Sequence, residues 1–251
     1  MFTRTIELRT LNHFKAAILE SKICNLKSKI PFVPIFFQHQ INENTRLGIW
    51  KIEETEEFFL SNVPLHAEVT HPLKRLQHLA GRFLLQFLCP GFPYELIRVA
   101  DTRKPYLPNE QYHFSISHCG DYAAAIVSSD HRVGVDIEIT SEKAGKIKDK
   151  FLTQNEQLIF SLTPPSVAEG LPKAQRDSMA VGSNLETLLW SAKESVYKWF
   201  GDGGVDFRKH IQLEGIDESD ETIIGHFTKT DRHLSIYYRN LNHLMLTWIV
   251  S

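Results

Sequence analysis

Three acidic side chains and one lysine stand at spacings that suit the binding of a metal ion and phosphate. Asp136 and Glu138 stand two apart in the alternating segment VGVDIE, so a strand would display both carboxylates on one face. Glu194 and Lys198 are four apart and share one face of an expected helix. The three carboxylates are hard oxygen ligands of the kind that suits Mg²⁺ bound beside substrate phosphates. Without the other acids, the Glu194–Lys198 spacing would be that of an ordinary surface ion pair.

Hydrophobic periodicity indicates the elements that must position these residues. Apolar side chains recur at helical spacing in residues 65–88, where His71-Pro72 gives a helix start, and in residues 185–200. A further helix is expected over 148–162. Residues 163–184 contain three prolines and scattered Gly and Ser, which predicts a long loop. Strands are expected at residues 113–116 and 122–128, joined in a hairpin, at 131–139, and in a terminal hairpin of residues 233–240 and 243–250.

Composition and charge restrict the class of protein. The chain has 251 residues, 42% hydrophobic and 23% charged, which is the profile of a globular protein of one or two domains. Its formal net charge of -2 provides no overall field for nucleic acid or an anionic membrane, so neither is expected as a partner. No signal peptide or membrane span is predicted.

Cysteine usage points to a reducing compartment. The three cysteines, Cys24, Cys89 and Cys119, are widely separated and form no CxxC pair, which argues against a disulfide framework and a zinc site. We therefore expect a cytoplasmic protein.

A weak similarity between residues 79–88 and 191–200 suggests two related α+β halves.

Five motifs, in their order and spacing, resemble the Sfp-type 4′-phosphopantetheinyl transferases. The resemblance implies an α+β fold in which two similar halves, residues 31–128 and 129–251, form a pseudo-dimer with the active site between them. Residues 1–30 would be an extension outside the resemblance, and a chain holding both halves favours a monomer. The motifs are KPYLP at 104–108, FSISHCGDYAA at 114–124, VGVDIE at 133–138, FLTQNE at 151–156 and WSAKESVYKWFGDG at 190–203.

The same resemblance implies roles for individual acids and for one lysine. Asp136, Glu138 and Glu194 correspond to the carboxylates that hold Mg²⁺ in the family. Glu156 corresponds to the glutamate proposed to deprotonate the acceptor serine, and Lys198 to the lysine that contacts the pyrophosphate and assists the leaving group.

Coenzyme A contacts are implied for a set of basic and hydroxyl residues. His118 is expected at the 3′-phosphate, and Arg103 stands where relatives commonly have Gly. Trp190, Trp199 and Tyr197 are expected to be packing residues. The expected coenzyme A contacts are Lys74, Arg75, Arg103, Lys104, Ser117, His118 and Lys198.

The resemblance predicts a holo-acyl-carrier-protein synthase. With Mg²⁺, it would transfer the 4′-phosphopantetheine group of coenzyme A to a serine of an apo acyl carrier protein or peptidyl carrier domain, releasing 3′,5′-ADP. Two other classes stay open. A non-catalytic module that binds coenzyme A or the carrier would not need the three carboxylates, and another Mg²⁺-dependent nucleotide enzyme would not need the Ser117-His118 pair.

Overall fold

Two antiparallel sheets form the framework of the protein. The computed structural model describes residues 35–65, 69–161 and 183–251. The first sheet has the order β1 (Ile35–Asn42), β2 (Thr45–Lys51), β6 (Tyr122–Ser128) and β5 (His113–Cys119). The second has the order β7 (Val133–Ile139), β11 (Leu244–Val250), β10 (Arg232–Leu241), β9 (Thr222–Phe227) and β8 (Ile211–Asp217).

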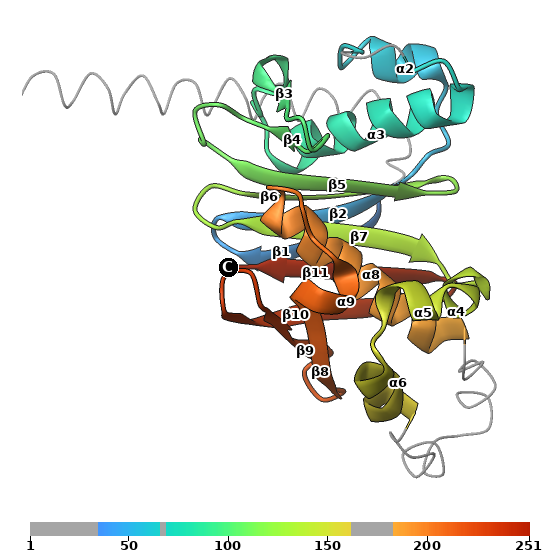
Figure 1. Cartoon of the computed structure of the whole chain (residues 1–251). Coiled ribbons are helices and arrows are strands. Elements are labelled where there is room, and N and C mark those ends of the chain that lie inside the picture. The colour runs from blue at the N-terminus through green and yellow to red at the C-terminus, as the bar shows by residue number, and fades with distance from the viewer. Residues whose placement is uncertain (1–34, 66–68, 162–182) are drawn as a thin grey trace, which may run out of the picture.

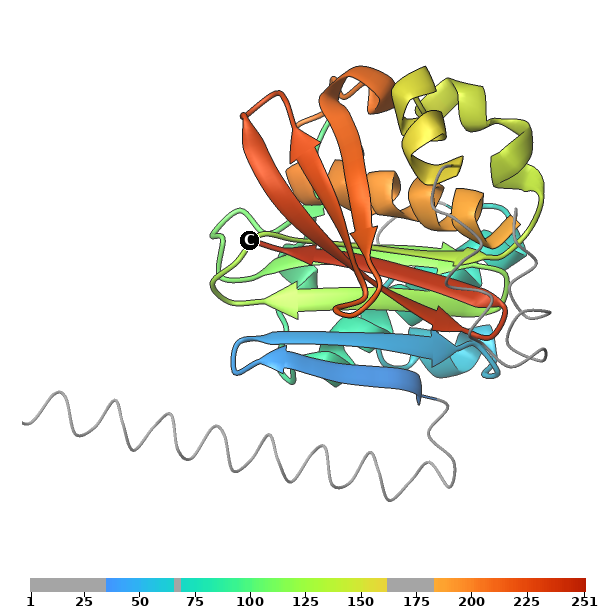
Figure 2. The ribbon, with the colours of Figure 1, turned by 90° about the horizontal axis from the view of Figure 1, so that it is seen from below.

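Helices lie on both sheets, as Figures 1 and 2 show. Two long helices, α3 (Pro72–Leu88) and α8 (Ser183–Phe200), pack on the first and second sheet respectively. The mixture of helices and sheets confirms the predicted α+β class. The shorter elements are α2 (Glu56–Leu60), η1 (Tyr94–Leu96), α4 (Lys143–Lys146), α5 (Lys148–Phe151), α6 (Gln154–Ser161), α9 (Phe207–His210) and the ribbon of β3 (Arg98–Val99) and β4 (Pro105–Tyr106).

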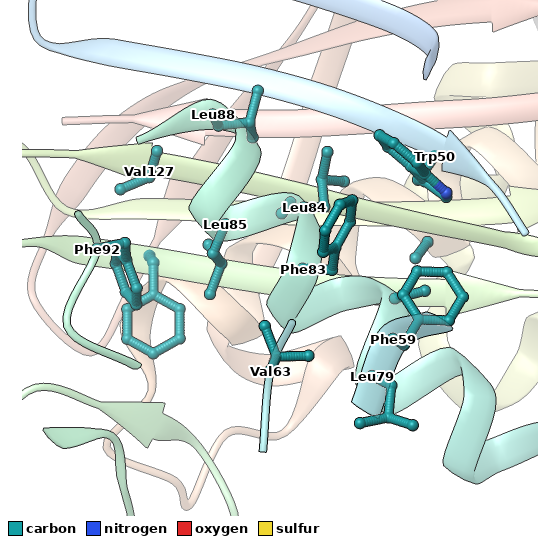
Figure 3. Close-up of a cluster of buried hydrophobic side chains, with 14 of the residues drawn as sticks. Trp50, Phe59, Val63, Leu79, Phe83, Leu84, Leu85, Leu88, Phe92 and Val127 are labelled. Carbon is teal, nitrogen blue, oxygen red and sulfur yellow. The ribbon is translucent and has the colours of Figure 1, made fainter. Parts of the chain in front are cut away.

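Helix α3 covers the first sheet with an apolar stripe. The helix begins at Pro72, whose fixed φ suits the first turn and whose missing N–H is not needed there. Its buried face meets an aromatic cluster in which the rings of Trp50 and Phe83 lie 5.1 Å apart, edge to face. Figure 3 shows this cluster, which includes Phe59, Val63, Leu79, Leu84, Leu85, Leu88, Phe92 and Val127.

Helix α8 lies unusually close to β7. Its apolar residues Leu189, Ala192 and Val196 are buried in the core of the second sheet. A Cβ atom at Gly134 of β7 would lie 2.1 Å from the carbonyl oxygen of Ser195 and within 3 Å of the Trp199 backbone. Only glycine leaves room for the helix at this point, so Gly134 sets how near α8 can approach the strand.

The two sheets meet along the edge strands β5 and β7. A third core cluster, which includes Ile49, Ile126, Val135 and Leu246, fills the space between the sheets. The two edges are joined by side chains rather than by a backbone ladder. Within the described ranges of the chain, β5 pairs with β6 alone and β7 with β11 alone. One such link is the bond from the Val135 amide to the Ser115 hydroxyl at 3.2 Å.

Several sequence predictions are confirmed and others are corrected. The strands at 113–116, 122–128 and 131–139, the helix at 185–200 and the terminal hairpin are confirmed. The helix expected within residues 65–88 begins at Pro72, at the predicted His71-Pro72 start signal. The helix expected over 148–162 is two helices, α5 and α6, since Thr153 starts a new helix. The hairpins β1–β2 and β8–β9 were not predicted.

Some predictions fall where the structure gives no description. The extension at residues 1–30 and nearly all of the loop at 163–184 lie outside the described residues. Among the helices that are described, none combines the length and apolar character needed to cross a membrane.

We expect Gly134→Ala to destabilise the protein by about 2 kcal/mol or more, because the added methyl group would collide with the backbone of α8. Urea denaturation followed by circular dichroism measures this. Gly215→Ala in β8 is the matched control, since a Cβ there would meet nothing within 4 Å. Equal stability of the two variants would contradict the close approach.

Candidate active site

Asp136 is the centre of a polar cluster where β5, β7 and α8 meet. Its carboxylate is buried, with 3% of the residue exposed. The Oδ1 atom accepts hydrogen bonds from Lys198 Nζ at 2.6 Å and from the Ser117 hydroxyl at 2.8 Å. The Oδ2 atom accepts from the Ser191 hydroxyl at 2.8 Å. Three donors from two helix positions and one strand therefore fix this carboxylate.

Glu138 faces the same side of β7 as Asp136, as the alternation of the sequence predicts. Its Oε1 atom accepts a hydrogen bond from the indole N–H of Trp190 in α8 at 3.1 Å. Burial raises the pKa of Glu138, and the nearby negative charge of Asp136 raises it further. Trp190, expected only to pack, thus also orients a candidate ligand.

Glu194 is the acid with free oxygens in this cluster. Within the described residues, no hydrogen bond or ion pair engages its carboxylate. Burial raises the pKa of Glu194 to about 7, with the charges of Asp136 and Glu138 adding to the effect and Lys198 opposing it. A carboxylate that is buried beside two others, without a donor, is poised to accept a proton or a cation.

The donor chemistry of this cluster suits a hard divalent cation. Asp136, Glu138 and Glu194 repel one another, and Lys198 is the cation that now offsets the charge of Asp136. Among the residues that the structure describes, no three acidic, histidine or cysteine side chains converge closely enough to hold a metal alone. Mg²⁺ needs only one or two protein carboxylates when phosphates and water complete its shell, so the residues fit this ion.

Positive side chains gather beside this cluster, on α3 and at the end of β5. The rings of His78 and His118 lie 5.7 Å apart. Burial lowers the pKa of His78, and the positive charges of Arg82 and Lys74 lower it further. The Nε atom of Arg82 is buried and has no hydrogen-bond partner. Lys74 and Arg82 thus place positive charge beside two imidazoles whose pKa values burial lowers, an arrangement that suits a bound anion.

The structure separates the other predicted coenzyme A contacts. Arg75 does not face the cluster, because its guanidinium pairs with Glu56 of α2 at 2.8 Å. Arg103 is exposed, with φ of 66°, a conformation that glycine adopts without strain. Lys104 donates to the carbonyl oxygen of Trp199 at the end of α8, at 3.1 Å, and burial lowers its pKa to about 8.

A cavity of about 270 Å³ opens where β4, β5 and the end of α8 meet. Lys104 and Arg132 line it together with the aromatic rings of Tyr106 and Phe200. Its lining includes His113 and Phe114 of β5 and Val133 of β7, so it lies toward the opposite end of these strands from Ser117 and Glu138 and does not include the acidic cluster.

Glu156 is the predicted site residue whose surroundings differ most from expectation. The structure buries it, with 2% of the residue exposed, in an ion pair with Lys193. It is therefore apart from the acidic cluster, on the other side of α8. The geometry does not support the role of proton acceptor that the resemblance implies.

Three residues that contact or adjoin the cluster were not predicted as site residues. Ser191 bonds Asp136, and its position in WSAKES three residues before Glu194 was the available signal. His78 and Arg82 follow Lys74 at intervals of four, which places all three on one face of α3. That spacing, rather than the pair Lys74-Arg75, marks the face directed at His118.

Comparison with known proteins gives one family. Residues 132–247 match the model of the 4′-phosphopantetheinyl transferase superfamily. Enterobactin synthase component D of Salmonella austin is 30% identical over 164 residues, which are 65% of this chain and 59% of that protein. The protein of the same name from Escherichia coli O157:H7 is 32% identical over 141 residues, 54% of this chain and 60% of its own length.

A relative with a different name agrees. The 4′-phosphopantetheinyl transferase gsp of Aneurinibacillus migulanus is 34% identical over 127 residues, 50% of this chain and 46% of that protein. This chain thus matches about three fifths of the length of the enterobactin synthase components and about half of gsp.

The raised pKa of Glu194 predicts a pH-dependent stability. Because the folded state holds this proton more tightly than the unfolded chain, the free energy of unfolding should fall as pH rises from about 4.5 to about 7. We expect Glu194→Gln to be more stable than the wild type at pH 8, by about 1–3 kcal/mol without divalent cations, and equal to it near pH 4.5. Urea denaturation at both pH values checks this, and a less stable variant at pH 8 would contradict it.

Proposed function

Since residues 132–247 belong to the 4′-phosphopantetheinyl transferase superfamily, we propose that this chain transfers 4′-phosphopantetheine from coenzyme A to a serine of an apo carrier protein. The observation that carries the proposal is the meeting of three motifs at Asp136. Ser117 comes from FSISHCGDYAA, Asp136 from VGVDIE and Lys198 from WSAKESVYKWFGDG. The Ser117 hydroxyl, Asp136 Oδ1 and Lys198 Nζ lie within 2.8 Å of one another.

The reaction requires one phosphorus–oxygen bond to form and another to break. The serine oxygen bonds to the phosphorus that carries pantetheine, the bond to the leaving phosphate breaks, and 3′,5′-ADP departs. The transition state is loose, so positioning and neutralisation of charge matter more than covalent help. Asp136, Glu138 and Glu194 are the carboxylates that would hold Mg²⁺, one or two of them at a time beside phosphate oxygens and water, and the ion would neutralise negative charge on the pyrophosphate.

Lys198 is placed to assist the leaving group. Its ammonium now bonds Asp136 Oδ1 and the Ser117 hydroxyl, and a quarter of its side chain is exposed. An ammonium group in this position can exchange its carboxylate partner for a phosphate oxygen and stabilise the charge that develops there. Removing it would leave Asp136 without its cation as well as removing the phosphate contact.

The serine proton needs an acceptor other than Glu156. Glu156 is buried and paired, whereas the carboxylate of Glu194 is free of partners among the described residues. We therefore assign no proton transfer to Glu156. Glu194 is the acid of the cluster whose oxygens are available to a cation or a proton.

The cationic side chains of α3 and β5 suit the phosphates of coenzyme A. Arg82 and Lys74 offer positive charge beside the imidazoles of His78 and His118, whose pKa values burial lowers and which can donate hydrogen bonds to a phosphate. The two sides of this site come from residues 31–128 and 129–251, which we propose as two similar halves of a monomer.

The proposed acceptors are acyl carrier proteins and peptidyl carrier domains. Both carrier classes are therefore tested side by side. Lys148 and Lys150 of α5 are exposed and would suit an acidic carrier surface.

Intact mass spectrometry tests the reaction directly. The protein is incubated with Mg²⁺, coenzyme A and an apo acyl carrier protein or an apo peptidyl carrier domain. We expect the carrier to gain one phosphopantetheine with wild-type protein, and the rate to fall at least 100-fold with Glu194→Ala. The control is Glu142→Ala, which removes an exposed acid at the start of α4 and should keep the wild-type rate. No mass gain on either carrier would refute the proposal.

Thermal stability distinguishes the remaining function classes. Coenzyme A should raise the unfolding midpoint by mass action, whereas ATP and NADPH at the same concentration should not. A shift with ATP alone would favour another nucleotide enzyme. A shift with coenzyme A but no transfer to any carrier would favour a binding module.

A further inference from the structure

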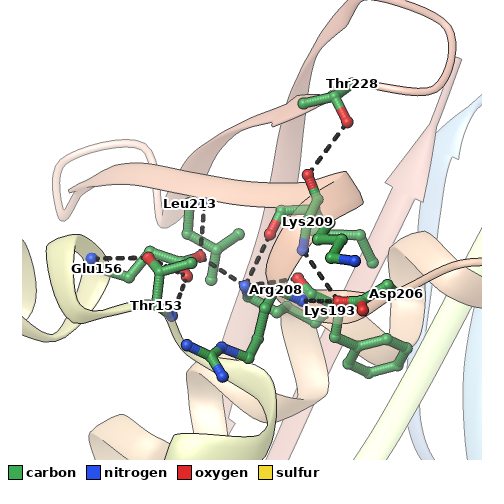
Figure 4. Close-up of polar contacts among 10 residues, drawn as sticks. Thr153, Glu156, Lys193, Asp206, Arg208, Lys209, Leu213 and Thr228 are labelled. Atoms are coloured by element: carbon green, nitrogen blue, oxygen red, sulfur yellow. Dashed lines mark hydrogen bonds and ion pairs between the residues drawn. The ribbon is translucent and has the colours of Figure 1, made fainter.

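A buried ion pair joins Glu156 of α6 to Lys193 of α8. Figure 4 shows this pair with its polar neighbours Thr153 and Leu213. The Lys193 side chain is fully buried, and its Nζ atom lies 2.5 Å from Glu156 Oε1. The same nitrogen donates to the carbonyl oxygens of Phe207 at 2.9 Å and Ile211 at 2.7 Å. Each of the three ammonium hydrogens therefore has an acceptor.

The carboxylate of Glu156 is equally occupied. Its Oε1 atom also accepts from the backbone N–H of Leu213 at 3.0 Å. Its Oε2 atom accepts from the backbone N–H and the hydroxyl of Thr153, at 2.7 and 2.9 Å. The Thr153 hydroxyl accepts in turn from the Glu156 N–H, which completes a capping box at the start of α6. No oxygen is left for a substrate.

The partners of this ion pair hold both neighbours of Trp190. The Phe207 ring lies 5.6 Å from the Trp190 ring, and Phe207 is the residue whose carbonyl oxygen Lys193 binds. The Phe151 ring lies 5.2 Å away on an edge-to-face contact, two residues before the Thr153 that Glu156 binds. The ion pair thus fixes the two aromatic walls of the Trp190 site.

From these contacts, we propose that Glu156 and Lys193 are positioning residues that seat Trp190 and, through its indole N–H, orient Glu138 toward the cation site. Trp190 donates to Glu138 at 3.1 Å, so a displaced indole would free that carboxylate to turn away. Lys193 also precedes Glu194 in α8, so the same pair fixes the helix that carries a second ligand. The inference rests on the proposed function only for the identity of the cation.

The indole N–H of Trp190 gives a readout that needs neither turnover nor metal. The chain has four tryptophans, and Trp190→Phe assigns the Trp190 signal in a ¹H–¹⁵N spectrum. We expect Glu156→Gln to move this signal, and to raise about tenfold the Mg²⁺ concentration that perturbs it in the wild type. Glu142→Gln, which breaks the exposed pair with Lys146, is the matched control and should change neither.

The alternative role of Glu156 as a base predicts a different result. In that case Glu156→Gln would leave the indole signal in place and abolish transfer, and this outcome would overturn the proposal. If Glu156→Gln does not fold, the double variant Glu156→Gln/Lys193→Met leaves no buried charge unpaired, and the same criterion applies to it. Since the spectrum is recorded without carrier or coenzyme A, an inactive wild type would refute the proposed function and leave this test intact.

Discussion

The close contact between α8 and β7 is the constraint on which the candidate site depends. Gly134 lets the helix backbone rest on the strand, and this sets Ser191 and Lys198 within hydrogen-bond distance of Asp136. If α8 lay farther from β7 by the width of one side chain, it would still complete the core of the second sheet. It would no longer bring a carboxylate and an ammonium group to the same face of β7. The site is thus a result of packing distance as much as of residue type.

Charge is distributed unevenly around this contact. Acids from β7 and α8 meet on one side, and the cations of α3 and β5 approach from the other. Neither group is neutralised by a matched partner within the described residues, apart from the single contact between Asp136 and Lys198. Such a separation is costly in a folded protein unless a ligand carries both a cation and phosphates into the gap. The proposed ligands, a divalent cation and the phosphates of coenzyme A, supply the opposite charge to each side.

The sequence predicted the elements that local patterns determine. Apolar spacing and Pro72 located α3, and the alternation of β7 correctly placed Asp136 and Glu138 on one face. Local sequence patterns could not predict contacts between segments that are distant in the chain. Glu156 meets Lys193 and Leu213 only because α6 folds back on β8, so a residue that resembled an active-site acid lies in a saturated, buried pair. The sequence prediction also missed the break between α5 and α6. The capping box that starts α6 involves only Thr153 and Glu156, which is too short a signal to stand out from the helical pattern of residues 148–162.

The boundary between the two sheets differs mechanically from the sheets themselves. Strands within each sheet are held by rows of backbone hydrogen bonds, but β5 and β7 are joined by side chains such as Ser115 and Ser117. Sliding one sheet along the other would break a few side-chain bonds and leave every ladder intact. This boundary lacks the backbone ladders that hold each sheet together, and the core cluster of Ile49, Ile126, Val135 and Leu246 packs across it. It also runs between the cationic and acidic sides of the site, so a small slip there would change the gap between them without unfolding either sheet.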